Sequence, residues 1–259
     1  MSDYDSIRYE KNFLTQVIVR IDFLQFLPTI QLLTPSIETE ILKSFPRRGK
    51  DQKIQFNAIN VTIDSSRLNT PDAQHEMIEG IQREYISGKN KLLLSNKFVV
   101  FEINDYESYD LHRESFRDVL HSLFAENELA SARVGIRYIN IFNSNDIKIR
   151  KNMFASSISS SIGANTLDKE GDIRLTRAMG MNEYQVSSMI LNFRYGMYNP
   201  DFPNPLQKKD FVLDFDCFTM EPIESSDGIL RCIDMGHKSI QVLFETSITD
   251  SLRKVLHDG

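Results

Sequence analysis

The segment Ala132–Phe142 has the sequence ARVGIRYINIF, and its pattern decides the fold class. Successive side chains of a strand point to opposite faces of a sheet, so a period of two predicts a β-strand. One face of this strand carries Val134, Ile136, Tyr138, Asn140 and Phe142. The other face carries Arg133, Gly135, Arg137, Ile139 and Ile141. The chain is therefore expected to contain a sheet, and the flanking segments decide its kind.

Other segments alternate in the same way or show the spacing of a helix. Alternation predicts strands at residues 13–26, 54–64, 174–186, 189–198 and 211–219, and two strands within 91–105 that turn at Ser95-Asn96. Helical spacing of apolar residues predicts helices at residues 37–45, 111–126 and 229–256. Ser36 is expected to cap the first helix. Residues 72–87 fit both a helix and a strand at the edge of a sheet, so both alternatives stay open.

These elements predict an α+β fold in two halves, each a mostly antiparallel sheet backed by amphipathic helices. We expect an N-terminal half at residues 1–145, a Ser-rich connecting loop at 146–172, and a C-terminal sheet with a long helix at 173–259. The two halves can also form one compact unit. Residues 97–108 (KFVVFEINDYES) resemble residues 210–221 (DFVLDFDCFTME), and a helix is predicted after each. This similarity leaves a degenerate duplication open.

Composition narrows the class of protein. The chain has 259 residues, and 30 Lys and Arg against 36 Asp and Glu give a net charge of −6, which argues against general nucleic-acid binding. The two cysteines, Cys217 and Cys232, form no disulfide framework and are expected to be reduced core thiols. The first residues lack the apolar region of a signal peptide, and no apolar run reaches the roughly 20 residues that cross a bilayer. We expect a cytoplasmic protein without a membrane segment.

Carboxylates offer one candidate chemistry. Asp214 and Asp216 are two residues apart and share one face of a predicted strand, and Glu102 lies on another strand. Carboxylate oxygens bind hard cations, so these residues are speculative ligands for a metal-dependent hydrolase or nuclease. No further motif accompanies them, and a solvated face on which Arg194 pairs with an aspartate is favoured. No metal or cofactor is predicted.

Histidines offer a second candidate. His237, Gln241 and Glu245 are four residues apart and form a row along the last predicted helix. Such a row holds a metal or moves a proton in some proteins, but a polar stripe beside the apolar face is favoured here. The chain contains no G-x-G, no P-loop and no G-x-S-x-G motif, so catalytic residues stay unknown.

Arginines offer a third candidate. Arg133 and Arg137 flank Gly135 on one strand face, and about 13 Å separates the two Cα atoms at 3.3 Å per residue. An anion over Gly135 would be held from both sides. An internal acid such as Glu102 is favoured over an external ligand, because buried charges are usually paired within a fold. With Arg194, these arginines are the candidates for binding an anion, a nucleotide or a partner between the two halves.

Three segments resemble a known family. They are residues 9–23 (YEKNFLTQVIVRIDF), 133–140 (RVGIRYIN) and 237–253 (HKSIQVLFETSITDSLR). In order and spacing they are similar to a family of sporadically distributed prokaryotic proteins of about this length. That family keeps N-P-L where this chain has Asn12-Phe13-Leu14, which is a minor departure. The resemblance implies one full-length unit in a prokaryotic cytoplasm and an accessory role in defence or toxin control, but it carries no activity.

A non-enzymatic binding or regulatory protein is the favoured function, with a protein partner or self-association. The polar faces of the sheet and the 143–172 loop are the expected binding surfaces. A metal-dependent hydrolase using Asp214 and Asp216 is the first alternative. Binding of an anion or nucleotide between the two halves is the second.

Overall fold

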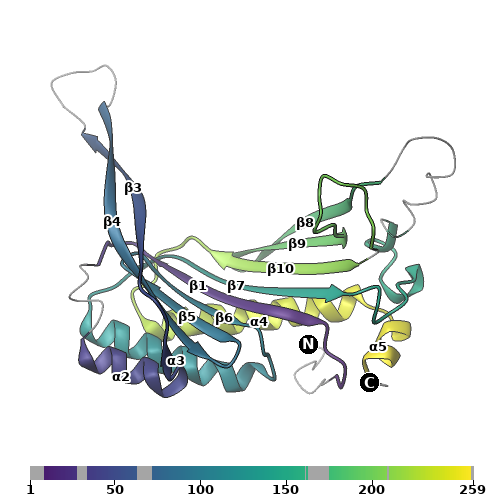
Figure 1. Ribbon diagram of the computed structural model, residues 1–259, viewed down its shortest axis with the longest axis horizontal. Helices are drawn as coiled ribbons and strands as arrows, with labels where there is room; N and C mark the ends of the chain where they lie inside the picture. The colour runs from purple at the N-terminus through teal and green to yellow at the C-terminus, as the bar shows by residue number, and fades with distance from the viewer. Residues whose placement is uncertain are drawn as a thin grey trace.

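The computed structural model of the protein describes residues 9–27, 34–62, 72–160, 162, 175–208 and 210–257, without the side chains of 57–62 and 72–76. Helices lie along one side of a single broad sheet, and a long hairpin extends from one end (Figure 1). The strands are β1 (Leu14–Phe23), β2 (Arg47–Arg48), β3 (Gln52–Thr62), β4 (Asp72–Ser87), β5 (Asn90–Ser95), β6 (Phe98–Ile103), β7 (Ser131–Phe142), β8 (Ala178–Val186), β9 (Met189–Met197) and β10 (Phe211–Thr219). The helices are α2 (Pro35–Ser44), α3 (Tyr109–Glu126), α4 (Ser226–Ser247) and α5 (Asp250–His257), with a 3-10 turn η1 (Lys151–Met153).

All strands of the described residues belong to one antiparallel sheet. Its order is β2-β4-β5-β6-β1-β7-β10-β9-β8, and β3 pairs with β4 off this path. β7 pairs with β1 on one side and with β10 on the other, so the two predicted halves meet in the middle of a continuous sheet. The α+β class with antiparallel strands and amphipathic helices is confirmed.

The topology repeats across the β1–β7 junction. In the first repeat, β1 is followed along the chain by the β4–β5 hairpin, β6 and then α3. In the second repeat, β7 is followed by the β8–β9 hairpin, β10 and then α4. β6 lies beside β1 as β10 lies beside β7, so the similar segments 97–108 and 210–221 occupy equivalent places. The repeated topology agrees with the duplication that the sequence leaves open.

The core lies between the helices and one face of the sheet. The face of β7 that carries Val134 and Ile136 is fully buried, and α4 crosses it. Gly236 allows α4 to come this close, because a Cβ atom there would lie 2.6 Å from Cγ2 of Ile136. Cys217 lies at the same contact, and burial raises the pKa of its thiol to about 12. Both cysteines are free thiols.

The structure settles or corrects three local expectations. Residues 72–87 form strand β4, which pairs with β3 along one part and with β5 along another. The helix predicted at 229–256 is wrong as one piece, because Ile248 forms an isolated β-bridge with Phe154 and separates α4 from α5. Thr34, not Ser36, caps α2, and its hydroxyl accepts a hydrogen bond from the backbone N–H of Ile37.

The Ser-rich loop is partly described. In its described part, Phe154 and Ile158 are buried against the core, so this stretch is packed structure. Residues 161 and 163–172 of the predicted loop lie outside the described residues. Within the described part of the chain, no helix is long and apolar enough to span a membrane.

Candidate functional site

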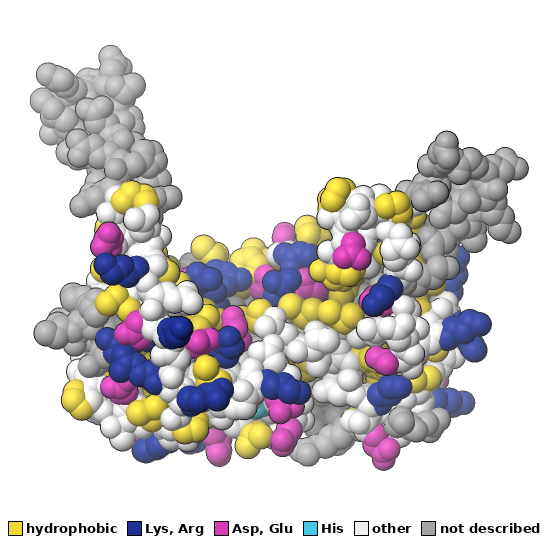
Figure 2. Space-filling model, viewed as in Figure 1, with side chains coloured by type: hydrophobic (Ala, Val, Ile, Leu, Met, Phe, Trp, Pro, Cys, Tyr) yellow, Lys and Arg dark blue, Asp and Glu magenta, His cyan; other side chains and the backbone are white. Residues whose placement is uncertain are grey.

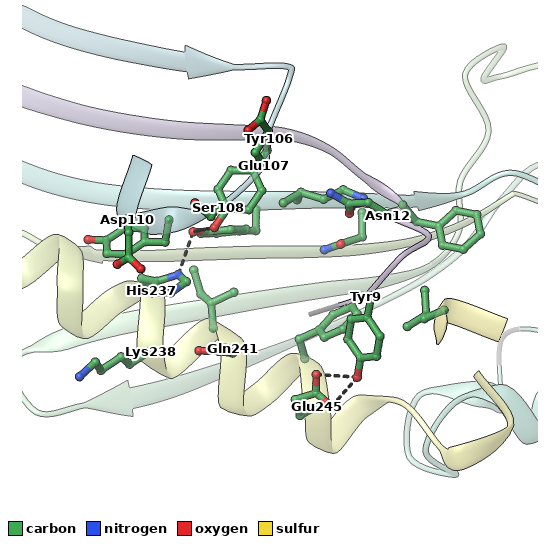
Figure 3. Close-up of a pocket in the computed structure, with 18 of the residues that line it drawn as sticks. Tyr9, Asn12, Tyr106, Glu107, Ser108, Asp110, His237, Lys238, Gln241 and Glu245 are labelled. Atoms are coloured by element: carbon green, nitrogen blue, oxygen red, sulfur yellow. Dashed lines mark hydrogen bonds between the residues drawn. The ribbon is translucent and has the colours of Figure 1, made fainter. Parts of the chain in front are cut away.

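A cavity of about 700 Å³ lies on the helical side of the sheet, where the two halves meet. The predicted first half (1–145) contributes the segment before β1, the start of α3 and β7, and the predicted second half (173–259) contributes α4. Figure 3 shows His237, Gln241 and Glu245 along α4, with Tyr9, Asn12 and Tyr106 around the same space. The predicted histidine row therefore lines the cavity along its length. Its side chains come from the polar stripe of α4 that the sequence favours.

His237 is held in place by two tyrosines. Its Nδ1 atom lies 2.8 Å from the hydroxyl of Tyr138 on β7. The ring of Tyr109 stacks on the imidazole with 3.9 Å between centroids and 8° between planes. The hydroxyl of Tyr106 lies 3.4 Å from that of Tyr138. Burial raises the pKa of Tyr138 well above its ordinary value, so this phenol stays protonated at neutral pH and serves as a hydrogen-bonding group.

An ion pair joins the two helices at one side of the cavity. Arg113 of α3 donates two hydrogen bonds to Asp234 of α4, at 2.6 and 2.8 Å. Tyr109 donates a third at 2.7 Å. Burial works against the charge of Asp234, but the hydrogen bonds from Arg113 and Tyr109 outweigh it and lower the pKa of this carboxyl. Asp234 is therefore a fixed, compensated anion in the wall of the cavity.

The pKa of Asp234 predicts how stability changes in acid. Because this pKa is lower in the folded protein than in the unfolded chain, the ion pair stabilises the fold above about pH 4 and loses its effect as the pH falls through the folded pKa. Asp234→Asn should lower the free energy of unfolding by about 1 kcal/mol at pH 7, because the pair is partly exposed. Urea denaturation from pH 7 to pH 3 measures this.

The difference between Asp234→Asn and the wild type should shrink below pH 4. Asp227→Asn is the control, because the side chain of Asp227 is 71% exposed. A deficit of Asp234→Asn that stays constant from pH 7 to pH 3 would contradict the assigned charge.

The segment before β1 closes another side of the cavity. The hydroxyl of Tyr9 lies 2.8 and 2.9 Å from the two carboxylate oxygens of Glu245. Glu245 is only 2% exposed, and Arg253 of α5 compensates its charge at 3.2 Å. The backbone N–H of Lys11 donates to the carbonyl of Leu256 at 2.9 Å. These contacts connect the segment before β1 to both C-terminal helices, α4 and α5.

Asn140 is the buried amide of the cavity wall. It lies on β7, is 7% exposed, and donates from Nδ2 to the carbonyl oxygen of Leu213 at 3.3 Å. Among the described residues, its Oδ1 atom accepts no hydrogen bond. Oδ1 is not one of the buried unpartnered atoms of the described residues, so it is accessible from the cavity that Asn140 lines and is an acceptor available to a bound molecule.

The arginine and aspartate candidates form a separate cluster on the face of the sheet opposite the helices. Arg137 donates to both oxygens of Asp214 at 2.7 Å, and Arg194 reaches the same carboxylate at 3.3 Å. Arg133 lies 3.4 Å from Asp216. The partners of these arginines are therefore acids of β10. The favoured pairing of Arg194 with an aspartate is found, whereas Glu102 is not the partner.

The guanidinium of Arg133 lies beside Gly135. A Cβ atom at Gly135 would lie 3.1 Å from the guanidinium nitrogens of Arg133, so the glycine makes room for that side chain. The same guanidinium lies over the ring of Phe218, 4.7 Å from its centroid. The expected single acid between Arg133 and Arg137 is therefore not found at Gly135; each arginine pairs with a different aspartate of β10.

The three speculative carboxylates do not converge. Glu102 is on β6 and Asp216 is on β10, so β1 and β7 lie between them. Three strand spacings of about 4.8 Å place their backbones roughly 14 Å apart. Among the described residues, no group of three or more His, Cys, Asp or Glu side chains could hold a metal ion. A hydrolase site at Asp214 and Asp216 stays a prediction that this arrangement does not favour.

Sequence patterns missed most of the cavity. Tyr106 lies just before α3 and Tyr109 is its first residue, and no sequence motif points to either one. Tyr138 belongs to the largely apolar face of the strand at residues 132–142. The available signal was the presence of Tyr138 and Asn140 on that otherwise apolar face, since buried polar tips need partners.

In comparisons with known proteins, the chain matches no family model and no curated protein sequence.

Proposed function

We propose that this chain is a binding or regulatory protein that takes up a small molecule in the cavity between its two halves. The observation that carries the proposal is the cavity itself, whose walls come from both halves. A volume of about 700 Å³ lies within the range of small-molecule sites. Binding there would bring the start of α3, the middle of α4 and the segment before β1 into contact with one molecule.

The polar groups of the cavity support binding because they are already in position. His237, Asp234 and Glu245 each have hydrogen-bond partners that fix the side chain. A preorganised site loses less side-chain entropy when it binds, which favours affinity. A cytoplasmic location and an accessory role in defence or toxin control belong to the same proposal and rest on the sequence and on the family resemblance alone.

A cavity-filling variant tests this function. Gln241→Trp places a large ring in the cavity, and Val242→Trp is the matched control because Val242 is the next residue of α4 and is 45% exposed. A panel of small metabolites is screened by thermal denaturation against the wild type and both variants. Ligand binding raises the melting temperature in proportion to RT ln(1 + [L]/Kd).

We expect at least one compound to raise the melting temperature of the wild type and of Val242→Trp by several degrees, but not that of Gln241→Trp. The unliganded melting temperatures of both variants verify that they fold. Equal shifts in all three proteins would place the ligand elsewhere and contradict the proposal.

The open face of the sheet supports a second candidate function, binding of a protein partner. Figure 2 shows basic, acidic and apolar side chains mixed in the hollow between the β3–β4 hairpin and β8. Arg20 lies over Phe98 with 4.7 Å to the ring centroid, as Arg133 does over Phe218. Arginine and aromatic residues are enriched in protein interfaces. Because aspartates neutralise the arginines, this face fits a protein better than a nucleic acid.

Self-association tests the second candidate. Met181 on the edge strand β8 is 60% exposed, so Met181→Asp should weaken an interface at this edge without lowering stability. Met220→Asp is the control, because Met220 is 62% exposed beyond the end of β10. Sedimentation velocity should show association of the wild type and of Met220→Asp but not of Met181→Asp. Association of all three would contradict a role for β8.

A further inference from the structure

Aromatic rings dominate the cavity walls. Tyr9 and Phe244 stand at one end, and Tyr106, Tyr109 and Tyr138 stand at the other. The rings of Tyr9 and Phe244 meet edge to face at 6.4 Å. Rings arranged in this way offer faces and edges to a flat molecule, against which stacking is favourable. The shape of the lining therefore favours a planar ligand.

The buried charges of the cavity are compensated within the protein. Arg113 pairs with Asp234, and Arg253 pairs with Glu245. The other charged residues of the described lining, Lys11, Glu107, Asp110 and Lys238, are only partly buried or exposed, so a charge on the deepest part of a ligand would be costly to bury. The part of the ligand that enters the cavity should therefore be neutral.

Asn140 sets the hydrogen bond that the ligand must make. Its Nδ2 atom is engaged by Leu213, so the group left over is the acceptor Oδ1. The side chain is more than nine-tenths buried and lines the cavity. A ligand that fills the cavity without an N–H or O–H donor at this point would leave this acceptor unsatisfied, which lowers affinity.

We propose that the cavity binds a nucleobase, carried as a nucleoside or nucleotide, with an N–H group of the base donating to Oδ1 of Asn140. A nucleobase is planar, neutral and edged with N–H donors, and aromatic side chains are its usual stacking partners. The inference rests on the proposed function and names its ligand class. Lys11 and Lys238 also line the cavity and would face the sugar or phosphate.

Calorimetric titration of the full chain tests the inference with adenosine, guanosine, cytidine, uridine and their 5′-monophosphates. Purine riboside is the control ligand, because its base carries no N–H donor. Asn140→Leu is the control variant, since it keeps the size of the side chain and removes the acceptor. One nucleobase should bind, and both controls should weaken binding roughly tenfold to a hundredfold. If the 5′-monophosphate binds more tightly than the nucleoside, and Lys238→Ala removes this difference, the ligand is a nucleotide. If the two bind with equal affinity, the ligand is a nucleoside.

Size-matched compounds of other classes, namely tryptophan, a disaccharide and a medium-chain fatty acid, are titrated alongside. If only compounds of these other classes bind saturably, and Gln241→Trp abolishes their binding, the nucleobase inference is overturned but the proposed function stands. Equal affinity of the wild type for purine riboside and adenosine would also overturn it, and this comparison needs no variant. Failure of the nucleobase panel, the other classes and the metabolite screen would overturn both proposals.

Discussion

Replacing Phe215 by alanine is expected to lower the free energy of unfolding by about 3–5 kcal/mol, the usual effect of emptying a buried aromatic site. Phe215 lies on β10 and is fully buried. Its ring stacks on Phe193 of β9, with 4.5 Å between centroids and 3° between planes, and meets the edge of Phe244 of α4. The substitution therefore removes ring contacts with strand β9 and with helix α4.

Chemical denaturation measures this effect, with Met220→Ala as the control. Met220 follows β10 directly but is 62% exposed, so its truncation should change stability by less than about 0.5 kcal/mol. Comparable small losses for both variants would show that α4 does not pack on β10 as described. By the same reasoning, truncation of Phe244 should cost less than truncation of Phe215, because Phe244 is only half-buried.

Replacing Arg253 by glutamine is expected to cost about 2–4 kcal/mol, because it leaves the buried carboxylate of Glu245 without a counter-charge. Glu245 is 2% exposed, and Arg253 contacts it at 3.2 Å from Nε. Arg253 also donates to the backbone carbonyl of Glu245 and to Asp250. Removal of the guanidinium therefore loosens the contact between α4 and α5 as well.

A double-mutant cycle separates the charge from these other contacts. Glu245→Gln combined with Arg253→Gln should be more stable than Arg253→Gln alone, because no buried charge is left uncompensated. Arg20→Gln is the matched surface control, since the pair of Arg20 with Asp22 is more exposed and worth at most about 1 kcal/mol. Equal losses for Arg253→Gln and Arg20→Gln would contradict a buried ion pair at the edge of the cavity.

Local patterns predict most strands of this fold because alternation is a local property. Alternation within Ala132–Phe142 is visible in the sequence, and the two faces it predicts are the core face and the open face. At residues 72–87 the apolar positions Met77, Ile78, Ile81 and Tyr85 also satisfy helical spacing. There the choice is made by hydrogen bonds to the neighbouring strands β3 and β5, which the spacing of apolar residues within 72–87 does not reveal.

The candidate site shows the same division between local and tertiary information. The i, i+4, i+8 spacing places His237, Gln241 and Glu245 on one side of a helix, and this follows from helix geometry alone. What the row faces depends on Tyr9 and Tyr138, which lie far away in the sequence. The pairing of Asp214 with Arg194 follows from strand register, because the two residues are directly opposite on β10 and β9.

The cavity between the two halves is the central claim, and a crystal structure of the complex tests it most directly. The protein is crystallised with the compound that most raises its melting temperature. The account predicts the ligand inside the cavity, with a ring against Tyr106 or Tyr138 and a donor within about 3 Å of Oδ1 of Asn140. A ligand bound on the open face of the sheet, with the cavity occupied by water alone, would contradict it.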